Sequence, residues 1–450
     1  MIFSKTELSD IFGQAISENI NDICINSNDA KPGDLFIALK GEKSDGHNFI
    51  DQALNNGAAL AISEKYIESD KIINVKSTKD ALIKLAKYNI AKCSATYVGV
   101  TGSVGKTTTK SLIYHILSRL LKNSVYTTKK NFNSQIGLPV CAAVMPRDTK
   151  IGIFEMGMSE AGEIKKLVDL IPPSVSIISK ICEAHGEFFN SVWDIAKAKS
   201  EIFETQKNRE AAIIPLDSPY ADFLKRRAIE NGIKNIFTFG AHSADAKIID
   251  RQFSDNKCRV RAEILGTKTD FLCPENFLIE NCLPALLCAH IVSGISPQNL
   301  ADEIHSFELS PGRGSRIYLE DRDIILADDS YNACMTSTKS AIKLLAEQKN
   351  RRKVLILGDM LELGKDEIHL HENLSATIDK FETDIVFACG PLAKKLFDNL
   401  RDCKKGAWCP NSAELLEKVR GNLQNGDCIL VKGSNSTKMN LIVDAIKKSD

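Results

Sequence analysis

The chain has 450 residues, of which 43% are hydrophobic and 26% are charged. A single hydrophobic core stops growing at roughly 250–300 residues, so a chain of this length predicts several domains. Lysine plus arginine equals aspartate plus glutamate, 58 against 58, which argues against a polyanion such as nucleic acid as the main partner. A local basic pocket for phosphate is still compatible with this balance.

The N-terminal residues 1–7 lack the basic-then-apolar pattern of a signal peptide, and no run of eighteen apolar residues predicts a membrane span. The thirteen cysteines are scattered, and none stands in a C-x-x-C pair. We interpret them as reduced thiols that fill cores in a reducing compartment. These features predict a cytoplasmic protein.

Residues 1–80 carry short apolar runs separated by turns. After the turn at 31–34, Leu35–Leu39 predicts a buried strand, and Ala58–Ser63 predicts another. Ile50–Asn56 between them predicts a short helix. We expect a small N-terminal α/β domain here.

Residues 81–310 alternate strands with helices. A helix at 81–92 leads into the strand Ala95–Val100, a glycine-rich loop and a helix at Thr107–Leu121. Later strands are predicted at Lys150–Met156, Val175–Ser179, Ala211–Pro215 and Ile236–Phe239. This rhythm is typical of a mainly parallel α/β sheet.

A new series of strands and helices begins near Ser310-Pro311-Gly312. Four short apolar runs separated by helical stretches follow, at Asp323–Ala327, Lys353–Leu357, Asp384–Ala388 and Asp427–Val431. They predict a Rossmann-like domain over residues 311–450. The expected fold is therefore α/β with three domains.

The strongest motif is Gly102-Ser103-Val104-Gly105-Lys106-Thr107, placed between a strand and a helix. Glycines let the backbone curl around a phosphate, Lys106 can reach terminal phosphates, and the Thr107 hydroxyl can ligate Mg²⁺. The match to a phosphate loop is partial because Val100 stands where the first glycine belongs. Such a loop specifies a nucleoside triphosphate and leaves a kinase, a switch GTPase and a ligase open, although no Asn-Lys-x-Asp guanine motif is present.

Glu155 ends an apolar strand, and a carboxylate at that end of a parallel strand faces the phosphate crevice, where it can hold Mg²⁺. The alternative is an ordinary surface glutamate. His185 follows the next strand, and Lys197 and Lys199 lie on a helix predicted at Val192–Glu204. Taken alone, these three residues are better interpreted as packing or solvated side chains.

Together, these motifs resemble one family, the ATP-dependent Mur ligases. The motifs that carry the resemblance are Thr101–Thr108, Asn131–Asn133, Glu155–Gly157, His185 and Ala196–Phe203. A second set is similar to the branch of this family that joins D-alanyl-D-alanine to UDP-N-acetylmuramoyl-tripeptide. It comprises Pro32–Leu39, Asp45–His47, Asp328–Ala333, Leu357–Gly364 and Lys432–Ser434.

The resemblance implies ATP and Mg²⁺ as cofactors and an acyl-phosphate route to the amide. It implies Lys106, Lys199 and His185 as catalytic residues. The implied ATP-binding residues are Gly102, Ser103, Gly105, Lys106, Thr107, Thr108, Asn281, Arg313, Asp329, Tyr331 and Asn332. The implied metal ligands are Thr107, Glu155, His185 and Lys199, the last as a carbamate. The implied UDP-substrate residues are Ser27, Gly46, His47 and Asn133.

The resemblance further implies a UDP-substrate domain at 1–80, an ATP-binding domain at 81–310, and a domain at 311–450 that closes over ATP and binds the dipeptide. We expect a monomer. His371 matches a family position to which no role is assigned, and the base for the amine is not identified. The third residue of the tripeptide, diaminopimelate or lysine, stays open.

Several positions depart from the family pattern, and they are Asn26, Asn28, Ser134, Gln135, Cys334, Met335 and Asn435. Because the phosphate and metal residues are intact, we expect activity to survive. Three other functions are compatible with part of these motifs: a sister ligase that adds the third amino acid, a folylpolyglutamate synthase, and a phosphate-loop protein without ligase activity. The first would require a His-Thr-Pro-Asp-like stretch where residues 330–333 stand, and the second would lack the UDP-binding domain.

Overall fold

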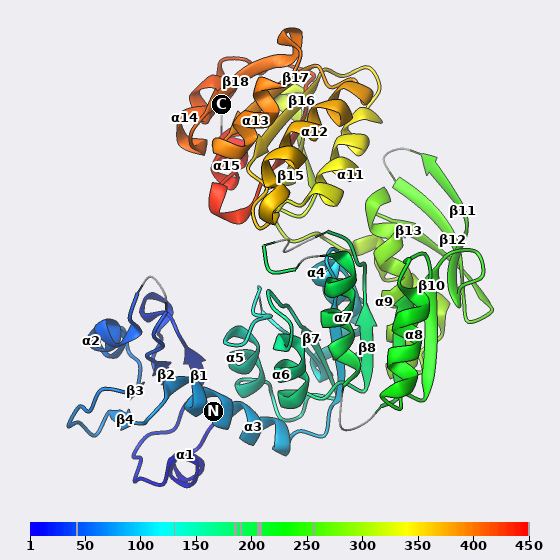
Figure 1. Cartoon of the computed structure of the whole chain (residues 1–450). Coiled ribbons are helices and arrows are strands. Elements are labelled where there is room, and N and C mark those ends of the chain that lie inside the picture. The colour runs from blue at the N-terminus through cyan, green and yellow to red at the C-terminus, as the bar shows by residue number, and fades with distance from the viewer. Residues whose placement is uncertain are drawn as a thin grey trace. The chain divides into compact units, whose positions relative to one another are not determined.

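The computed structural model describes residues 1–41, 44–129, 131–183, 187–189, 191–204, 209–254 and 257–448. Its strands form three sheets of four, nine and six strands (Figure 1). The chain divides into two units: unit 1 comprises residues 1–180 and 196–306, and unit 2 comprises 181–195 and 307–450. The first two sheets belong to unit 1 and the third to unit 2. The expected α/β fold in three parts is confirmed.

The first sheet is small and entirely parallel, in the order β1-β2-β3-β4. Its strands are β1 (Asp22–Cys24), β2 (Asp34–Ile37), β3 (Leu60–Ser63) and β4 (Ile72–Asn74). The helix α2 (Ile50–Asn55) connects β2 to β3 and packs on the sheet through Ile50 and Ala53. The predicted strands at 35–39 and 58–63 and the helix between them are confirmed. β1 and β4 escaped prediction because three residues are too few to show a period.

An ion cluster joins α1 (Lys5–Phe12) to the elements that follow the first sheet. Glu7 Oε1 accepts hydrogen bonds from Lys92 Nζ at 2.8 Å, at the end of α3 (Thr78–Lys92), and from Arg147 Nη1 at 2.9 Å. Burial alone would raise the pKa of Glu7, but the bonds from Arg147 and Lys92 outweigh it and lower that pKa to about 2. This cluster ties the N-terminal helix to the rest of unit 1.

The second sheet carries the phosphate loop. Its order is β13-β12-β11-β10-β9-β8-β5-β7-β6, and every pairing from β10 to β6 is parallel. These parallel strands are β5 (Thr96–Thr101), β6 (Val125–Thr127), β7 (Ile151–Glu155), β8 (Val175–Ile178), β9 (Ala211–Pro215) and β10 (Asn235–Gly240). The predicted strands at 95–100, 150–156, 175–179, 211–215 and 236–239 are therefore confirmed.

An antiparallel extension of this sheet was not predicted. It consists of β11 (Ala246–Ser254), β12 (Lys257–Ile264) and β13 (Thr267–Cys273), joined as two hairpins. The side chains of β13 alternate between exposed and buried from Lys268 onward, as expected for a strand with one solvated face. That period of two is the sequence signal that would have revealed the extension.

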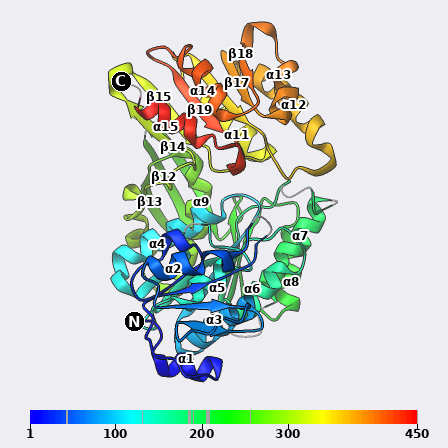
Figure 2. The same cartoon turned by 90° about the vertical axis from the view of Figure 1, so that its left-hand side faces the viewer.

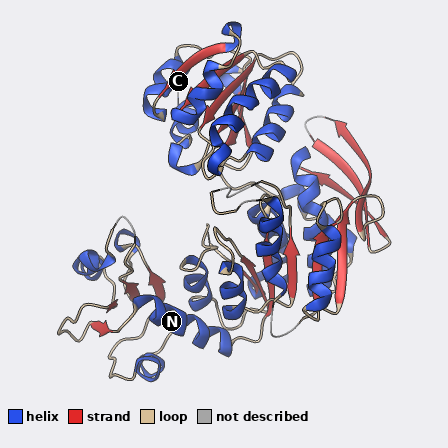
Figure 3. Cartoon of the chain, in the orientation of Figure 1, coloured by secondary structure: helices blue, strands red, loops and turns tan. Residues whose placement is uncertain are grey.

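The helices of the second sheet pack on both sides of its strands (Figure 3). They are α4 (Lys106–Leu121), α5 (Gly137–Ala143), α6 (Glu163–Leu170), α7 (Val192–Ser200), α8 (Ala221–Glu230), α9 (Ile279–Ser293) and α10 (Pro297–Ala301). One stretch, Asn276–Ser293, is long and apolar enough to cross a membrane by length and composition, with a mean hydropathy of 1.3. It coincides with α9, which packs against α4, β11 and β12, so protein covers its apolar surface.

The third sheet has the order β14-β15-β19-β16-β17-β18, and only the pairing of β14 with β15 is antiparallel. Its strands are β14 (Ser315–Leu319), β15 (Ile324–Asp329), β16 (Lys353–Gly358), β17 (Ile385–Cys389), β18 (Lys405–Cys409) and β19 (Cys428–Lys432). The four strands predicted in this region are β15, β16, β17 and β19, so the Rossmann-like expectation is confirmed.

Helices lie on both faces of the third sheet (Figure 2), and a hydrophobic core lies between the helices and the sheet on each face. One core packs α14 (Ser412–Arg420) and α15 (Asn440–Lys448) against Val354 and Ile356 of β16. The other packs α11 (Met335–Ala346), α12 (Glu367–Lys380) and α13 (Pro391–Asp398) against Leu355 and Leu357. Successive residues of a buried strand point to opposite faces, which explains the continuous apolar runs in the sequence.

Candidate active site

The phosphate loop follows β5 and curls into the N-terminus of α4. Gly105 has φ +86°, a conformation that glycine adopts without strain, and an added Cβ would lie 2.5 Å from Asn281 Nδ2. An added Cβ on Gly102 would lie 2.1 Å from Ser179 Oγ at the end of β8. Both glycines are therefore needed because side chains from β8 and α9 approach the loop closely.

Lys106 begins α4, so its backbone stands at the positive end of a sixteen-residue helix. Its Nζ donates to the loop carbonyls of Gly102 at 2.8 Å and Ser103 at 3.2 Å, which holds the ammonium beside the loop. The predicted residues Gly102, Ser103, Gly105, Lys106, Thr107 and Thr108 all lie in this single turn. The arrangement can bind an anion through a helix N-terminus and a cation together.

Glu155 ends β7 directly beside the loop and is only 2% exposed. Its Oε2 accepts a hydrogen bond from Thr107 Oγ1 at 2.7 Å, and its Oε1 accepts one from Asn133 Nδ2 at 2.7 Å. The ammonium of Lys110, one turn after Lys106, lies 3.9 Å from Oε2. The structure thus brings the two predicted metal ligands Thr107 and Glu155 into contact.

This pair fits Mg²⁺, because a hydroxyl and a carboxylate oxygen side by side are the hard oxygen ligands that the ion prefers. Within the described residues, no group of three histidine, cysteine or acidic side chains could hold a metal. Mg²⁺ bound through one or two protein oxygens generally takes its other ligands from nucleotide phosphates and water. The donor set on Thr107 and Glu155 matches that mode of binding.

The structure describes only one of the two other predicted metal ligands, His185 and Lys199. His185 lies outside the described residues. Lys199 lies on α7 and is 1% exposed, which is unusual for lysine, whereas Lys197 on the same helix is exposed. The prediction that Lys199 is a solvated helical lysine is therefore wrong. The same prediction for Lys197 is confirmed.

Asn281 lies in the first turn of α9 and contacts the phosphate loop. Its Nδ2 donates to Thr109 Oγ1 at 3.2 Å and to the Gly105 carbonyl at 3.5 Å. Ser179 acts similarly from β8, where its Oγ donates to the Val104 carbonyl at 2.7 Å. Sequence reasoning missed Ser179, although its position at the end of a predicted parallel strand was a usable signal.

The predicted ATP residues of unit 2 meet at the end of β15. The Arg313 guanidinium carbon lies 3.9 Å from the centroid of the Tyr331 ring, a cation–π contact. Lys432 Nζ, from the end of β19, donates to Asp329 Oδ2 at 2.7 Å and to the Asn332 carbonyl at 2.9 Å. Burial raises the pKa of Asp329, and the Lys432 ammonium opposes that rise. Lys432 is thus the residue that connects this cluster.

The predicted UDP-substrate residues do not form a single cluster. Gly46 packs so closely on Leu39 that an added Cβ would lie 2.6 Å from its carbonyl oxygen. His47 Nδ1 lies 2.6 Å from Asp45 Oδ1, and its Nε2 accepts from the Glu64 N–H at 3.0 Å. Ser27 Oγ, in contrast, donates to Gln52 at 2.9 Å.

Asn133 stands apart from the other three, because its amide is bound to Glu155. Its backbone carbonyl also accepts from the Gly157 N–H at 2.8 Å. The structure therefore shows Asn133 orienting the buried carboxylate, a contact that the sequence did not reveal.

Comparisons with known proteins agree with this geometry. Residues 19–92 match the family described as Mur ligase family, catalytic domain; residues 100–289 match the Mur ligase middle domain; and residues 312–435 match the Mur ligase, glutamate ligase domain. The chain is 35% identical to the UDP-N-acetylmuramoyl-tripeptide–D-alanyl-D-alanine ligase of Rickettsia prowazekii over 99% of each chain.

Two solved structures extend the likeness to the fold. MurF from Acinetobacter baumannii superposes with a TM-score of 0.87 at 26% identity, over 99% of each chain. The MurF ligase of Thermotoga maritima in complex with ADP gives a TM-score of 0.81 at 28% identity, covering 95% of this chain and 97% of that one. The likeness therefore extends across all three sheets rather than only the nucleotide-binding part.

Proposed function

The chain belongs to the Mur ligase family, and we infer that it is the ATP-dependent ligase that adds D-alanyl-D-alanine to UDP-N-acetylmuramoyl-tripeptide. The products are UDP-N-acetylmuramoyl-pentapeptide, ADP and phosphate, in the synthesis of peptidoglycan precursors. The observation that carries this function is the phosphate loop with Glu155 bound to Thr107, within a chain that resembles such ligases from end to end. The 35% identity over 99% of each chain favours this reaction over those of the two rival ligases.

An amide does not form from a carboxylate and an amine in water without activation. We propose that the tripeptide carboxylate attacks the γ-phosphorus of ATP, which gives an acyl phosphate and ADP. The amine of D-alanyl-D-alanine then attacks the acyl carbon, the C–O bond to phosphate breaks, and the amine loses its proton. Such transfer depends on positioning and on neutralising charge rather than on covalent help from the protein.

The residues of unit 1 divide this work by their positions. Lys106 and the backbone N–H groups of the loop bind the terminal phosphates, and Lys106 stabilises charge that develops on the transferring group. Thr107 and Glu155 would hold Mg²⁺, which when bound would supply positive charge to neutralise the phosphates. Asn133 donates to the Glu155 carboxylate and the Lys110 ammonium lies beside it, and these contacts keep the carboxylate oriented in its buried position.

The remaining roles follow the division of the chain. We propose that residues 1–80 bind the UDP end of the substrate through Ser27, Gly46 and His47. Residues 81–310 bind ATP, with Asn281 near the adenine. Residues 311–450 contribute Arg313, Asp329, Tyr331 and Asn332 to ATP and hold the dipeptide. A cytoplasmic location is supported by the chemistry of the substrates, ATP and a UDP-sugar peptide, and by the absence of disulfide bonds among the described cysteines.

Lys199 is proposed to react as a neutral amine with CO₂, forming an N–C bond and releasing one proton to give a carbamate. Its burial supports this, because a carbamate provides a buried anionic ligand where an unmodified lysine provides a cation. His185 is proposed as its companion ligand. Replacing Lys199 with alanine should lower kcat by about 10²-fold, and short carboxylic acids added to the assay should restore part of it.

Lys197→Ala is the matched control, since Lys197 is exposed on the same helix. Its activity should equal that of the unmodified protein. Removing bicarbonate from the assay should slow the unmodified enzyme and leave Lys199→Ala unchanged. Equal activity of Lys199→Ala and the unmodified enzyme would refute the carbamate.

The function itself is tested by phosphate release from Mg-ATP in the presence of UDP-N-acetylmuramoyl-tripeptide, with and without D-alanyl-D-alanine. Mass spectrometry follows the pentapeptide. Release that requires both substrates, together with product, is the expected result. Running the assay with tripeptides ending in diaminopimelate and in lysine identifies the physiological substrate. Absence of product with either tripeptide would overturn the proposed function.

A further inference from the structure

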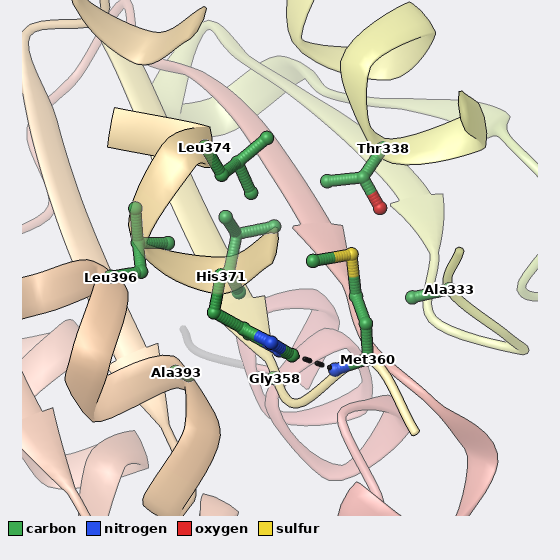
Figure 4. Close-up of a pocket in the computed structure, with 9 residues that line it drawn as sticks. Ala333, Thr338, Gly358, Met360, His371, Leu374, Ala393 and Leu396 are labelled. Atoms are coloured by element: carbon green, nitrogen blue, oxygen red, sulfur yellow. Dashed lines mark hydrogen bonds between the residues drawn. The ribbon is translucent and has the colours of Figure 1, made fainter. Parts of the chain in front are cut away.

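One buried histidine in unit 2 has an environment that the roles assigned so far do not use. His371 lies on α12, is 1% exposed, and points at the loop that follows β16 (Figure 4). Its Nε2 accepts a hydrogen bond from the Met360 N–H at 3.0 Å. Its Nδ1 lies 2.6 Å from the Glu367 carbonyl oxygen, one turn earlier on the helix.

These two contacts define the state of the ring. A carbonyl oxygen only accepts, so Nδ1 carries the proton, and an amide N–H only donates, so Nε2 carries none. Burial lowers the pKa of His371 below its usual 6.5, although the Glu367 carbonyl and nearby carboxylates oppose the shift. The imidazole is therefore neutral, and both nitrogens are occupied. It has no free lone pair with which to take a proton from the attacking amine.

The Met360 amide belongs to a loop that is bound on both sides. Just before it, the Asp359 carboxylate accepts from the Ala393 N–H at 2.6 Å, and the Asp359 carbonyl accepts from the Ser434 N–H at 2.9 Å. Just after it, the Leu361 N–H donates to Ser434 Oγ at 2.9 Å. His371 thus fixes the central amide of three residues, 359–361, that connect the end of β16 to the loop after β19.

The surroundings of the ring are apolar and closely packed. A small pocket beside His371 is lined by Ala333, Thr338, Leu357, Met360, Leu374 and Leu396. It is too narrow for a water molecule. With the ring in place, no water can reach the Met360 N–H as an alternative acceptor, and a buried amide without a partner is costly. The position of the loop therefore depends on an acceptor supplied by residue 371.

We propose that His371 is a positioning residue for the D-alanyl-D-alanine substrate, acting as a neutral acceptor that fixes the loop 359–361 beside the loop 432–435. This rests on the proposed function of residues 311–450 as the part that holds the dipeptide. His371 is not the base for the amine. Its contribution is the fixed geometry of two adjoining loops, which are joined by the bonds between residues 359–361 and Ser434.

The proposal has a consequence for pH. Protonation of His371 places Nε2–H against the Met360 N–H, so two donors face each other and the bond is lost. Within the described residues, the charged groups that face the ring are Asp359 on the loop and Glu367 on its own helix. The neighbouring helices α11 and α13 contribute Thr338, Ala393 and Leu396 to the pocket beside the ring, and none of these side chains titrates.

The lowered pKa of His371 sets the direction of this pH dependence. Because the folded protein binds this proton less readily than the unfolded chain, the native loop is intact above pH 6.5. The native loop is lost as the pH falls through the pKa that His371 has in the folded protein. The KM for D-alanyl-D-alanine should therefore rise on the acid side, below pH 6.5. The KM for ATP should not follow, since the phosphate loop contains no histidine.

The experiment compares the full-length enzyme with His371→Gln and His371→Leu, measuring kcat and each KM from pH 5.5 to 8. Glutamine can accept from the Met360 N–H with Oε1, whereas leucine fills the space without an acceptor. We expect His371→Leu to raise the dipeptide KM by roughly tenfold at pH 7.5. We expect His371→Gln to stay within about threefold and to lose the acid-side rise, because it does not titrate.

Two results would overturn the proposal. If His371→Gln loses kcat at every pH as fully as His371→Leu, the ring transfers a proton. If His371→Leu leaves the dipeptide KM unchanged, or raises all three KM values equally, the residue only supports folding. Hydrogen exchange at the Met360 amide, faster in the leucine variant and slow in the glutamine variant, checks the contact without any turnover. That readout keeps the inference testable even if no pentapeptide is formed.

Discussion

The phosphate loop of unit 1 and the strand-end cluster of unit 2 handle charge in different ways. The first is a contiguous stretch whose donors are backbone N–H groups and one lysine, framed by Ser179 and Asn281. The second joins residues far apart in the chain, and its centre is the pair of Lys432 with Asp329, 103 positions away. One site is defined by local backbone shape, and the other depends on a buried ion pair.

Because of this difference, substitutions in the two sites should affect different properties of the protein. A glycine-rich loop at a helix N-terminus keeps its shape when one side chain is removed, because the curl is a property of the backbone. A buried ion pair loses far more when one partner is removed, because the other is left as an uncompensated charge. Substitutions in the first site should therefore affect turnover, and substitutions in the second should affect folding first.

The largest effect is expected for Lys106→Ala. Loss of the ammonium beside the loop removes charge stabilisation at the phosphoryl group in transfer, so kcat should fall by about 10³-fold. The melting temperature should stay within about 2 °C, since the bonds from Lys106 to the Gly102 and Ser103 carbonyls join groups within one loop. Phosphate release and calorimetry measure the two quantities. Lys84→Ala, an exposed lysine of α3, is the control and should change neither.

A large loss of stability in Lys106→Ala would contradict the contrast between the two sites, because it would mean that the loop depends on this side chain for its shape. A loss of turnover with unchanged stability would support the contrast.

The contiguous site is also the one that the sequence predicted well. Strand, loop and helix are adjacent in the chain, so the order of residue types reports their order in space, and Gly102 to Thr108 appear as expected. Glu155 was predicted because parallel strands present their carboxyl ends at one edge. The binding of Asn133 to Glu155 was not, since loops carry no period from which a contact can be derived.

The strand-end cluster was predicted only in part, for a physical reason. Asp329, Tyr331 and Asn332 are adjacent in sequence, but their connection to Lys432 depends on β19 lying between β15 and β16. Strand order is decided by packing across the whole sheet, which no local pattern encodes. His371 was noted without a role for the same reason, because its partner Met360 comes from a different element.

The second effect in size is expected for Lys432→Met. Lys432 is almost fully buried and Asp329 is partly exposed, so removing the ammonium should cost about 2–4 kcal/mol of the stability of unit 2. The double variant Lys432→Met/Asp329→Asn should recover part of that loss, because the carboxylate is then no longer left unpaired. Urea unfolding followed by tryptophan fluorescence measures it.

Trp408 lies on β18 of the third sheet and Trp193 on α7, so the measurement is made in a Trp193→Phe background, where Trp408 alone reports on unit 2. Unit 1 should retain its melting temperature. A cost below about 0.5 kcal/mol for Lys432→Met, with no recovery in the double variant, would place this pair among weak surface ion pairs and contradict the contrast between the two sites.

The smallest effects are expected for two side chains that contact the phosphate loop. They test whether the shape of the loop comes from its backbone alone. Asn281→Ala removes bonds of 3.2 and 3.5 Å, whereas Ser179→Ala removes a hydroxyl that lies 2.7 Å from the Val104 carbonyl and 3.2 Å from the Thr101 carbonyl. Shorter bonds are stronger, so we expect the KM for ATP to rise about threefold in Asn281→Ala and about tenfold in Ser179→Ala, with kcat within about twofold. Initial rates at varied ATP measure both. A fall of kcat by 10²-fold in either variant would show that these side chains shape the loop, and that its geometry is not a property of the backbone alone.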